Sequence, residues 1–249
     1  RTNIASPHAE VDSAVRTVAW RNIDNAGPAG SINSNVLEMA QWTRLQLNNG
    51  TVGGKRLIST RLVEEMHTPQ TVIRNDSASR AFNPETHFMS YGLGWFLEDY
   101  RGREVVHHGG NVDGFTALVA MMPEEKLGLV ILTNMNGTGL PSVLMRKLFD
   151  LHLKAPARDW SGDAYTRLEQ SRARAAEAQK RAGAPQKVAG GKPTLPLSEY
   201  TGTFVDSLHG EMVVTEVGGA LQLTFGPNWQ GPLEYWNADN LVLLLIGLY

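Results

Sequence analysis

The residues best suited to chemistry stand together as His107-His108-Gly109-Gly110-Asn111. An imidazole accepts or donates a proton near neutral pH. Glycines lack Cβ, so a ligand or a facing backbone can approach them closely where a strand ends. This segment therefore predicts a binding edge on a sheet.

The elements that must position these residues are three apolar runs, at residues 104–107, 115–122 and 127–132. Their length and their β-branched content are typical of buried strands, and Gly and Pro-Glu-Glu-Lys segments separate them. We expect consecutive antiparallel strands. Because neighbouring side chains on a strand point to opposite faces, His107 and His108 are not expected to bind one metal ion, and no metal site is predicted.

Four sequence features carry a family resemblance: His108-Gly109-Gly110, Gly114-Phe115 opening a strand, Pro123-Glu124, and a strand that ends Leu132-Thr133-Asn134. Together they resemble the third active-site motif and flanking strands of the serine β-lactamase and penicillin-binding-protein superfamily. The likeness is greatest to the class C branch with its esterases, D-aminopeptidases and D-alanyl-D-alanine carboxypeptidases. That motif is Lys-Thr-Gly, for which His-x-Gly is a common replacement.

Two further segments match the same family. Tyr-Gly-Leu-Gly-Trp at 91–95 corresponds to a strand ahead of the motif strand, and Pro-Ala-Gly-Ser at 28–31 leads into a helix near the site. The resemblance implies an α+β fold, in which an antiparallel sheet is flanked by helices as in β-lactamases and transpeptidases. It also implies a serine hydrolase without a cofactor, secreted or periplasmic, that acts on a small ester, amide or D-amino-acid peptide.

The resemblance assigns roles to four residues. The backbone N–H of Asn111 would donate to the oxyanion, and the side chain of His108 would bind a substrate carboxylate or assist proton movement. Gly109 and Gly110 would line the substrate site, with Gly110 small enough for substrate to lie against the strand. Asp113 is expected to be a turn residue.

The family nucleophile is absent from this sequence, because no serine is followed by lysine three residues later. The family order is Ser-x-x-Lys, Tyr-x-Asn, then the third motif, so both are expected upstream of Arg1 and the chain is interpreted as a carboxy-terminal portion. Tyr235-Trp236-Asn237 comes after His108 in the wrong domain, whereas Ser31-Ile32-Asn33 has the right order but is a short motif common before helix caps. The alternative is a catalytically silent relative or fragment that serves only in binding.

Composition limits the partners. With 23 basic and 25 acidic residues the net charge is -2, which offers no general attraction to nucleic acid. There is no cysteine, and no apolar run is long enough to span a bilayer. The 249 residues suffice for one full domain and a smaller one.

We divide the chain into a catalytic-type domain at 1–154, a charged helical linker at 155–196 and a lipocalin-like β domain at 197–249 that stops before its barrel closes. Helices are predicted at 35–47, 60–66 and 143–151, and a surface loop at 71–86. A short strand is expected at 15–20. In the last domain, strands are expected at 200–204, 212–217, 220–225 and 241–246.

Overall fold

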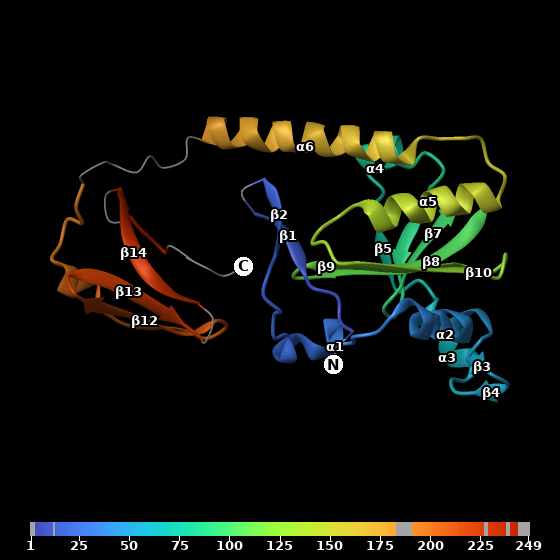
Figure 1. The fold of residues 1–249 in the computed structure, drawn as a ribbon, viewed down its shortest axis with the longest axis horizontal. Helices are drawn as coiled ribbons and strands as arrows, with labels where there is room; N and C mark the ends of the chain where they lie inside the picture. The colour runs from blue at the N-terminus through green and yellow to red at the C-terminus, as the bar shows by residue number, and fades with distance from the viewer. Residues whose placement is uncertain (1–2, 12, 183–190, 227–228, 238–239, 244–249) are drawn as a thin grey trace. The chain divides into compact units, whose positions relative to one another are not determined.

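The computed structural model describes residues 3–11, 13–182, 191–226, 229–237 and 240–243 (Figure 1). Contacts between residues divide the chain into two units, Arg1–Tyr165 and Thr166–Tyr249. The first unit holds all the motifs of the family resemblance. The division into three parts at residues 154 and 196 stays a prediction.

A six-stranded antiparallel sheet forms the centre of the first unit, with the strand order β10-β9-β8-β7-β6-β5. Each strand pairs with the next one along the chain, as predicted for the last three. The strands are β5 (Thr71–Ile73), β6 (Met89–Tyr91), β7 (Phe96–Tyr100), β8 (Arg103–Val112), β9 (Phe115–Met122) and β10 (Leu127–Thr133).

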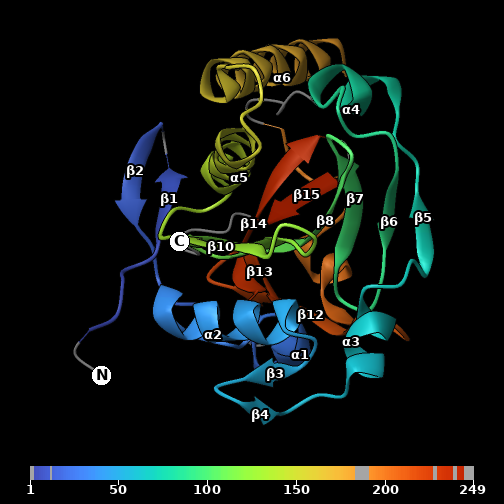
Figure 2. The same ribbon diagram turned by 90° about the vertical axis from the view of Figure 1, so that its right-hand side faces the viewer.

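Helices cover both faces of this sheet: α2 (Val36–Leu47) and α3 (Thr60–Met66) lie on one side and α5 (Leu140–His152) on the other (Figures 1 and 2). Strand alternation explains the two layers. Val105 faces the core beneath α5 with Met145 and Phe149, whereas Val106 faces the α2 side with Val119 and Met121. The fold is therefore the helix-flanked antiparallel sheet that the sequence predicted.

Shorter elements surround this core. They are β1 (His8–Val11), β2 (Ala14–Thr17), η1 (Asp24–Ala26), α1 (Gly27–Gly30), β3 (Thr51–Val52), β4 (Lys55–Arg56) and α4 (Ser77–Phe82). The 23-residue helix α6 (Trp160–Ala182) begins in the first unit and continues into the second. Asp150 of α5 fixes the start of α6, since its Oδ2 accepts a 2.7 Å hydrogen bond from Trp160 Nε1 and its Oδ1 accepts one of 2.8 Å from Arg101 Nε.

The strand expected at 15–20 corresponds to β2 at residues 14–17, and its hairpin partner β1 was not predicted. Three other local predictions in the first unit were wrong. Residues 71–86 contain β5 and α4 instead of a loop, and residues 92–95 of the expected 91–95 strand connect β6 to β7. β8 does not end at the glycines but continues through them to Val112, because β9 pairs with it along its whole length. The helices predicted at 35–47, 60–66 and 143–151 correspond to α2, α3 and α5.

The second unit contains a five-stranded antiparallel sheet in which each strand again pairs with its successor. A strand over residues 229–237 was not predicted, and the end of the expected 241–246 strand lies outside the described residues. The lipocalin-like assignment stays a prediction. The elements are η2 (Leu197–Tyr200), β11 (Gly202–Asp206), β12 (Gly210–Val217), β13 (Ala220–Phe225), β14 (Trp229–Asn237) and β15 (Asn240–Leu243).

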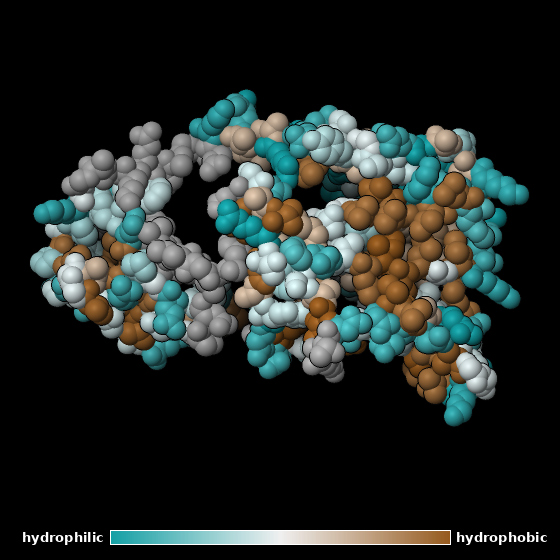
Figure 3. All heavy atoms as spheres, in the orientation of Figure 1, coloured by the Kyte–Doolittle hydropathy of each residue, from teal (hydrophilic) through white to brown (hydrophobic). Residues whose placement is uncertain are grey.

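Apolar side chains gather on the surface of the first unit around α5 and β10 (Figure 3). Leu140, Leu148 and Leu151 of α5 are 49%, 40% and 61% exposed, respectively. β10 lies at the edge of the sheet and pairs only with β9 among the described strands. A single exposed leucine is ordinary, whereas a row beside an edge strand is a surface that can associate with other apolar groups.

Candidate active site at the open edge of strand β8

The predicted motif occupies the part of β8 that extends past β7. The β7–β8 ladder runs from the Tyr100–Arg103 pair to the Phe96–His107 pair. Beyond His107, β8 continues as far as Val112 with β9 on one side only. In the described part of the chain, no strand therefore pairs with the other side of His108 to Val112.

Strand geometry tells which backbone groups face this open edge. Val112 pairs with Phe115 across the two-residue turn Asp113-Gly114. Residues that flank such a turn exchange both of their hydrogen bonds, and hydrogen-bonded pairs then recur at every second residue. Even-numbered residues of β8 therefore direct their N–H groups to β9. The N–H groups of Gly109 and Asn111 point the other way, to the open edge.

The side chain of His108 lies on the same face of β8 as Gly110, and its Nε2 is 2.9 Å from the Tyr91 hydroxyl. Burial lowers the pKa of His108, and the neighbouring charge of His107 lowers it further, whereas a hydrogen bond with the Gly109 backbone raises it. The net shift is downward, so the imidazole is neutral at neutral pH. Phe96 packs close to this ring, with a centroid distance of 5.6 Å.

His107 points to the opposite face and takes part in a buried charged cluster. Its Nε2 is 3.4 Å from Glu98 Oε1, and Arg146 of α5 donates to both Glu98 oxygens at 2.7 and 2.9 Å. Burial alone would raise the pKa of Glu98. The His107 and Arg146 interactions outweigh it and lower the pKa to about 2. This cluster links His107, the residue before the His-x-Gly motif, to α5.

The two motif glycines have different surroundings. A Cβ on Gly110 would meet nothing within 4 Å, so the space above Gly110 is open to a ligand. A Cβ on Gly109 would lie 3.1 Å from the Ala117 carbonyl oxygen and 3.2 Å from Leu118 Cδ1. Gly109 is thus a close-packing position, and Gly110 is the one that leaves room above the strand.

Asn111 is held from its side-chain end. Its Oδ1 accepts hydrogen bonds from Thr116 Oγ1 at 2.6 Å and from the Gly137 N–H at 3.1 Å. These contacts fix the side chain, while the backbone N–H and C=O of Asn111 both face the open edge. Asp113 forms an exposed 3.1 Å ion pair with Arg21 and lies in the hairpin turn, where the sequence placed it.

The two discounted motifs have other surroundings in the structure. Ser31 Oγ donates to the Gly27 carbonyl at 2.8 Å, a local helix-end contact, and a Cβ on the preceding Gly30 would lie 3.3 Å from Val112 Cγ2, at the end of β8. The Tyr-x-Asn match at 235–237 lies within β14 of the second unit. Sequence reasoning did not find the hydrogen bond between Tyr91 and His108, because 17 residues separate the two. The pairing of β6 with β7 and of β7 with β8 was the available signal.

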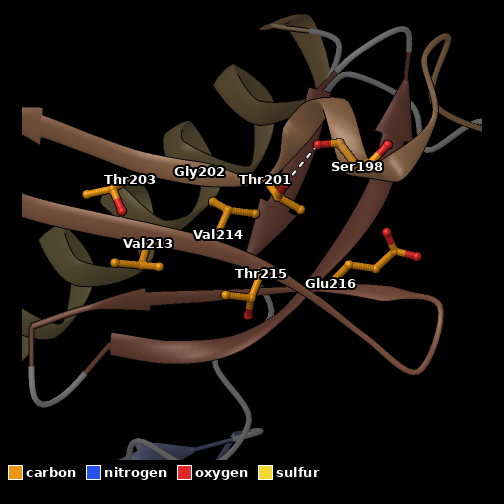
Figure 4. A pocket seen from close by; sticks show the side chains of 8 residues that line it. All are labelled: Ser198, Thr201, Gly202, Thr203, Val213, Val214, Thr215 and Glu216. Carbon is orange, nitrogen blue, oxygen red and sulfur yellow. Dashed lines mark hydrogen bonds between the residues drawn. The ribbon is translucent and has the colours of Figure 1, made fainter.

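Two surface pockets lie elsewhere. One, of about 460 Å³, belongs to the second unit (Figure 4), and the other, of about 510 Å³, lies between α5 and residues 157–161. Within the described residues, no group of three His, Cys, Asp or Glu side chains could hold a metal ion, and no helix is long and apolar enough to cross a membrane. The first pocket is lined by Ser198, Thr201, Gly202, Thr203, Val213, Val214, Thr215 and Glu216.

A helix-flanked antiparallel sheet of this kind is the fold of β-lactamase and transpeptidase-like proteins. The chain belongs to the Beta-lactamase family, whose model matches residues 2–154. Residues 186–243 match a domain of unknown function, DUF3471.

Curated relatives carry hydrolase names. The chain is 29% identical over 231 residues to the unguisins hydrolase ungD of Aspergillus violaceofuscus, covering 86% of this chain and 40% of that protein. It is 28% identical over 203 residues to unguisins hydrolase ungD' of Aspergillus campestris, covering 75% and 34%. The chain thus spans well under half the length of these relatives.

Among solved structures, the chain resembles the octameric penicillin-binding protein homologue from Pyrococcus abyssi. The TM-score is 0.52 at 17% identity, over 99% of this chain and 48% of that one. At this identity the likeness concerns the fold.

Proposed function

We propose that this chain forms one wall of the active site of a serine hydrolase that cleaves small esters or amides through an acyl-enzyme. The open edge of β8 is the observation that carries the proposal, because one stretch of unpaired strand holds the His108 side chain, an unobstructed Gly110 and the free N–H of Asn111. Membership of the Beta-lactamase family and the hydrolase names of the relatives support the same reaction class.

The chemistry at this edge is acyl transfer. A serine hydroxyl attacks the carbonyl carbon while its proton passes to a base, and the carbonyl electron pair moves onto oxygen. The Asn111 N–H donates to that oxyanion, a contribution of about 3 to 4 kcal/mol in enzymes where such a donor has been removed. Collapse of the intermediate expels the protonated alcohol or amine, and water then releases the acid from the serine.

The proposal assigns the nucleophile to a segment outside these 249 residues, since no Ser-x-x-Lys occurs among them. The serine, its lysine and a Tyr-x-Asn group would face the β8 edge from another wall. His108 and the Asn111 N–H would then contact the substrate on the side opposite the serine hydroxyl.

The state of His108 bears on the substrate class. A lysine at this motif position is a permanent cation, whereas His108 is neutral at neutral pH because burial and His107 lower its pKa. A neutral ring attracts a substrate carboxylate less. We therefore propose esters and small D-amino-acid peptides as substrates in preference to penicillins.

A covalent label tests the proposal. A fluorophosphonate probe added to the full-length protein is expected to modify one serine that has lysine three residues later and lies outside these 249 residues. Peptide mapping by mass spectrometry identifies the serine, and a neutral chromogenic ester should be hydrolysed faster than a cephalosporin. A label on any serine of this chain would contradict the assignment, and neither label nor turnover would indicate a silent relative.

A further inference from the structure

Tyr91 reaches His108 from the end of β6. Its hydroxyl is 2.9 Å from His108 Nε2, and its ring packs edge-on against Phe96 with centroids 4.8 Å apart. Phe96 is also the strand partner of Tyr91, so backbone pairing and ring packing fix the phenol together. The hydroxyl is thereby directed at one nitrogen of the imidazole.

The surroundings of His108 indicate which ring nitrogen carries the proton. A neutral imidazole has one N–H and one acceptor nitrogen. An unprotonated imidazole nitrogen is a stronger acceptor than a phenol oxygen, and a phenol O–H is a stronger donor than a neutral imidazole N–H. The 2.9 Å contact between the Tyr91 hydroxyl and Nε2 therefore favours a phenol that donates to an unprotonated Nε2, which leaves the ring proton on Nδ1. A hydrogen bond with the Gly109 backbone, which raises the pKa of His108, is consistent with this arrangement.

We propose that Tyr91 is a positioning residue that holds neutral His108 in its Nδ1–H tautomer by donating a hydrogen bond to Nε2. The effect of this role on catalysis rests on the proposed function. Because the lone pair of Nε2 accepts from Tyr91, His108 does not serve as the free base that activates the nucleophile. The imidazole instead forms a polar, uncharged wall beside Gly110. A substrate group bound beside Gly110 would therefore contact the hydrogen-bonded pair of Tyr91 and His108 together.

Histidine-ring NMR of the full-length protein, labelled with ¹⁵N in histidine, tests the inference at neutral pH. The His108 signals, identified by their loss in His108→Gln, are expected to show a protonated Nδ1 and an unprotonated Nε2. Tyr91→Phe keeps the ring that packs on Phe96 and removes the hydroxyl. It should shift the tautomer population toward Nε2–H.

A matched control is Tyr165→Phe, which removes the hydroxyl of a tyrosine that is 65% exposed, and the tautomer should stay unchanged. A protonated Nε2 in the unaltered protein would overturn the inference even if Tyr91→Phe failed to fold. The same tautomer in the folded Tyr91→Phe variant would also overturn it. The readout needs no turnover, so it stands apart from the labelling result that tests the proposed function.

Discussion

At the scale of single residues, His107 and His108 show how adjacent histidines take different environments on one strand. His108 meets a phenol at an open edge, and His107 meets a carboxylate in the core. Period-two alternation predicted that the two side chains would lie on opposite faces of the strand. The partners were not predictable, because Glu98 and Arg146 lie 48 residues apart in the sequence and meet only when α5 packs on the sheet.

The buried Glu98 gives a pH-dependent prediction. Its pKa falls from 4.5 to about 2 on folding, so its contribution is present above pH 4.5 and is lost as the pH falls toward 2. A shift of this size corresponds to about 3 kcal/mol. Glu98→Gln should lower the free energy of unfolding by about 3 kcal/mol at pH 7, because Arg146 loses its carboxylate, and should flatten the decline in acid.

Urea unfolding of this chain between pH 2 and 7 measures both effects. Glu64→Gln, on the exposed surface of α3, is the control and should keep the parental stability and acid dependence. An equally steep acid decline in Glu98→Gln would show that other carboxylates cause it.

At the scale of elements, the sequence predicted those whose signals are local. Asn35, which precedes a run of apolar residues at helical spacing, predicted the start of α2. In the structure its Oδ1 accepts hydrogen bonds from the N–H groups of Leu37 and Glu38 at 3.0 and 3.1 Å. β14 was not predicted, because Gly231-Pro232 interrupts its run of strand-forming residues. Pairing with β13 nevertheless keeps these two residues within the strand. The extension of β8 through the glycines depends in the same way on its neighbour β9.

The α2 cap provides the prediction at this scale. Asn35→Ala removes the acceptor of two helix N–H groups and should cost about 1 kcal/mol of stability. Asn35→Asp keeps an acceptor oxygen and should restore most of that loss. Thermal unfolding of the two variants compares them, and equal melting temperatures for alanine and aspartate would mean that the cap does not stabilise the fold.

At the scale of the whole molecule, the chain supplies a sheet edge but no family nucleophile, and it spans 40% of the unguisins hydrolase ungD. The family, the order of the last three strands of the sheet and the strand that carries the His-x-Gly motif could be predicted from the sequence because short motifs mark strand ends. The free side of β8 could not, because it depends on where β7 stops relative to β8. That difference in strand length leaves one side of β8 from His108 to Val112 without a strand partner among the described residues.

A pair of variants in the full-length protein tests most directly whether the Asn111 backbone N–H stabilises the oxyanion, as we propose. Asn111→Ala removes the side chain that accepts from Thr116 and Gly137 but keeps the N–H. Asn111→Pro also removes the N–H, which β9 does not use. Steady-state hydrolysis of a neutral ester gives kcat for each, with melting temperatures to confirm folding. We predict that the proline variant is about 100- to 1,000-fold slower than the alanine variant, whereas equal kcat values in two folded variants would contradict the claim.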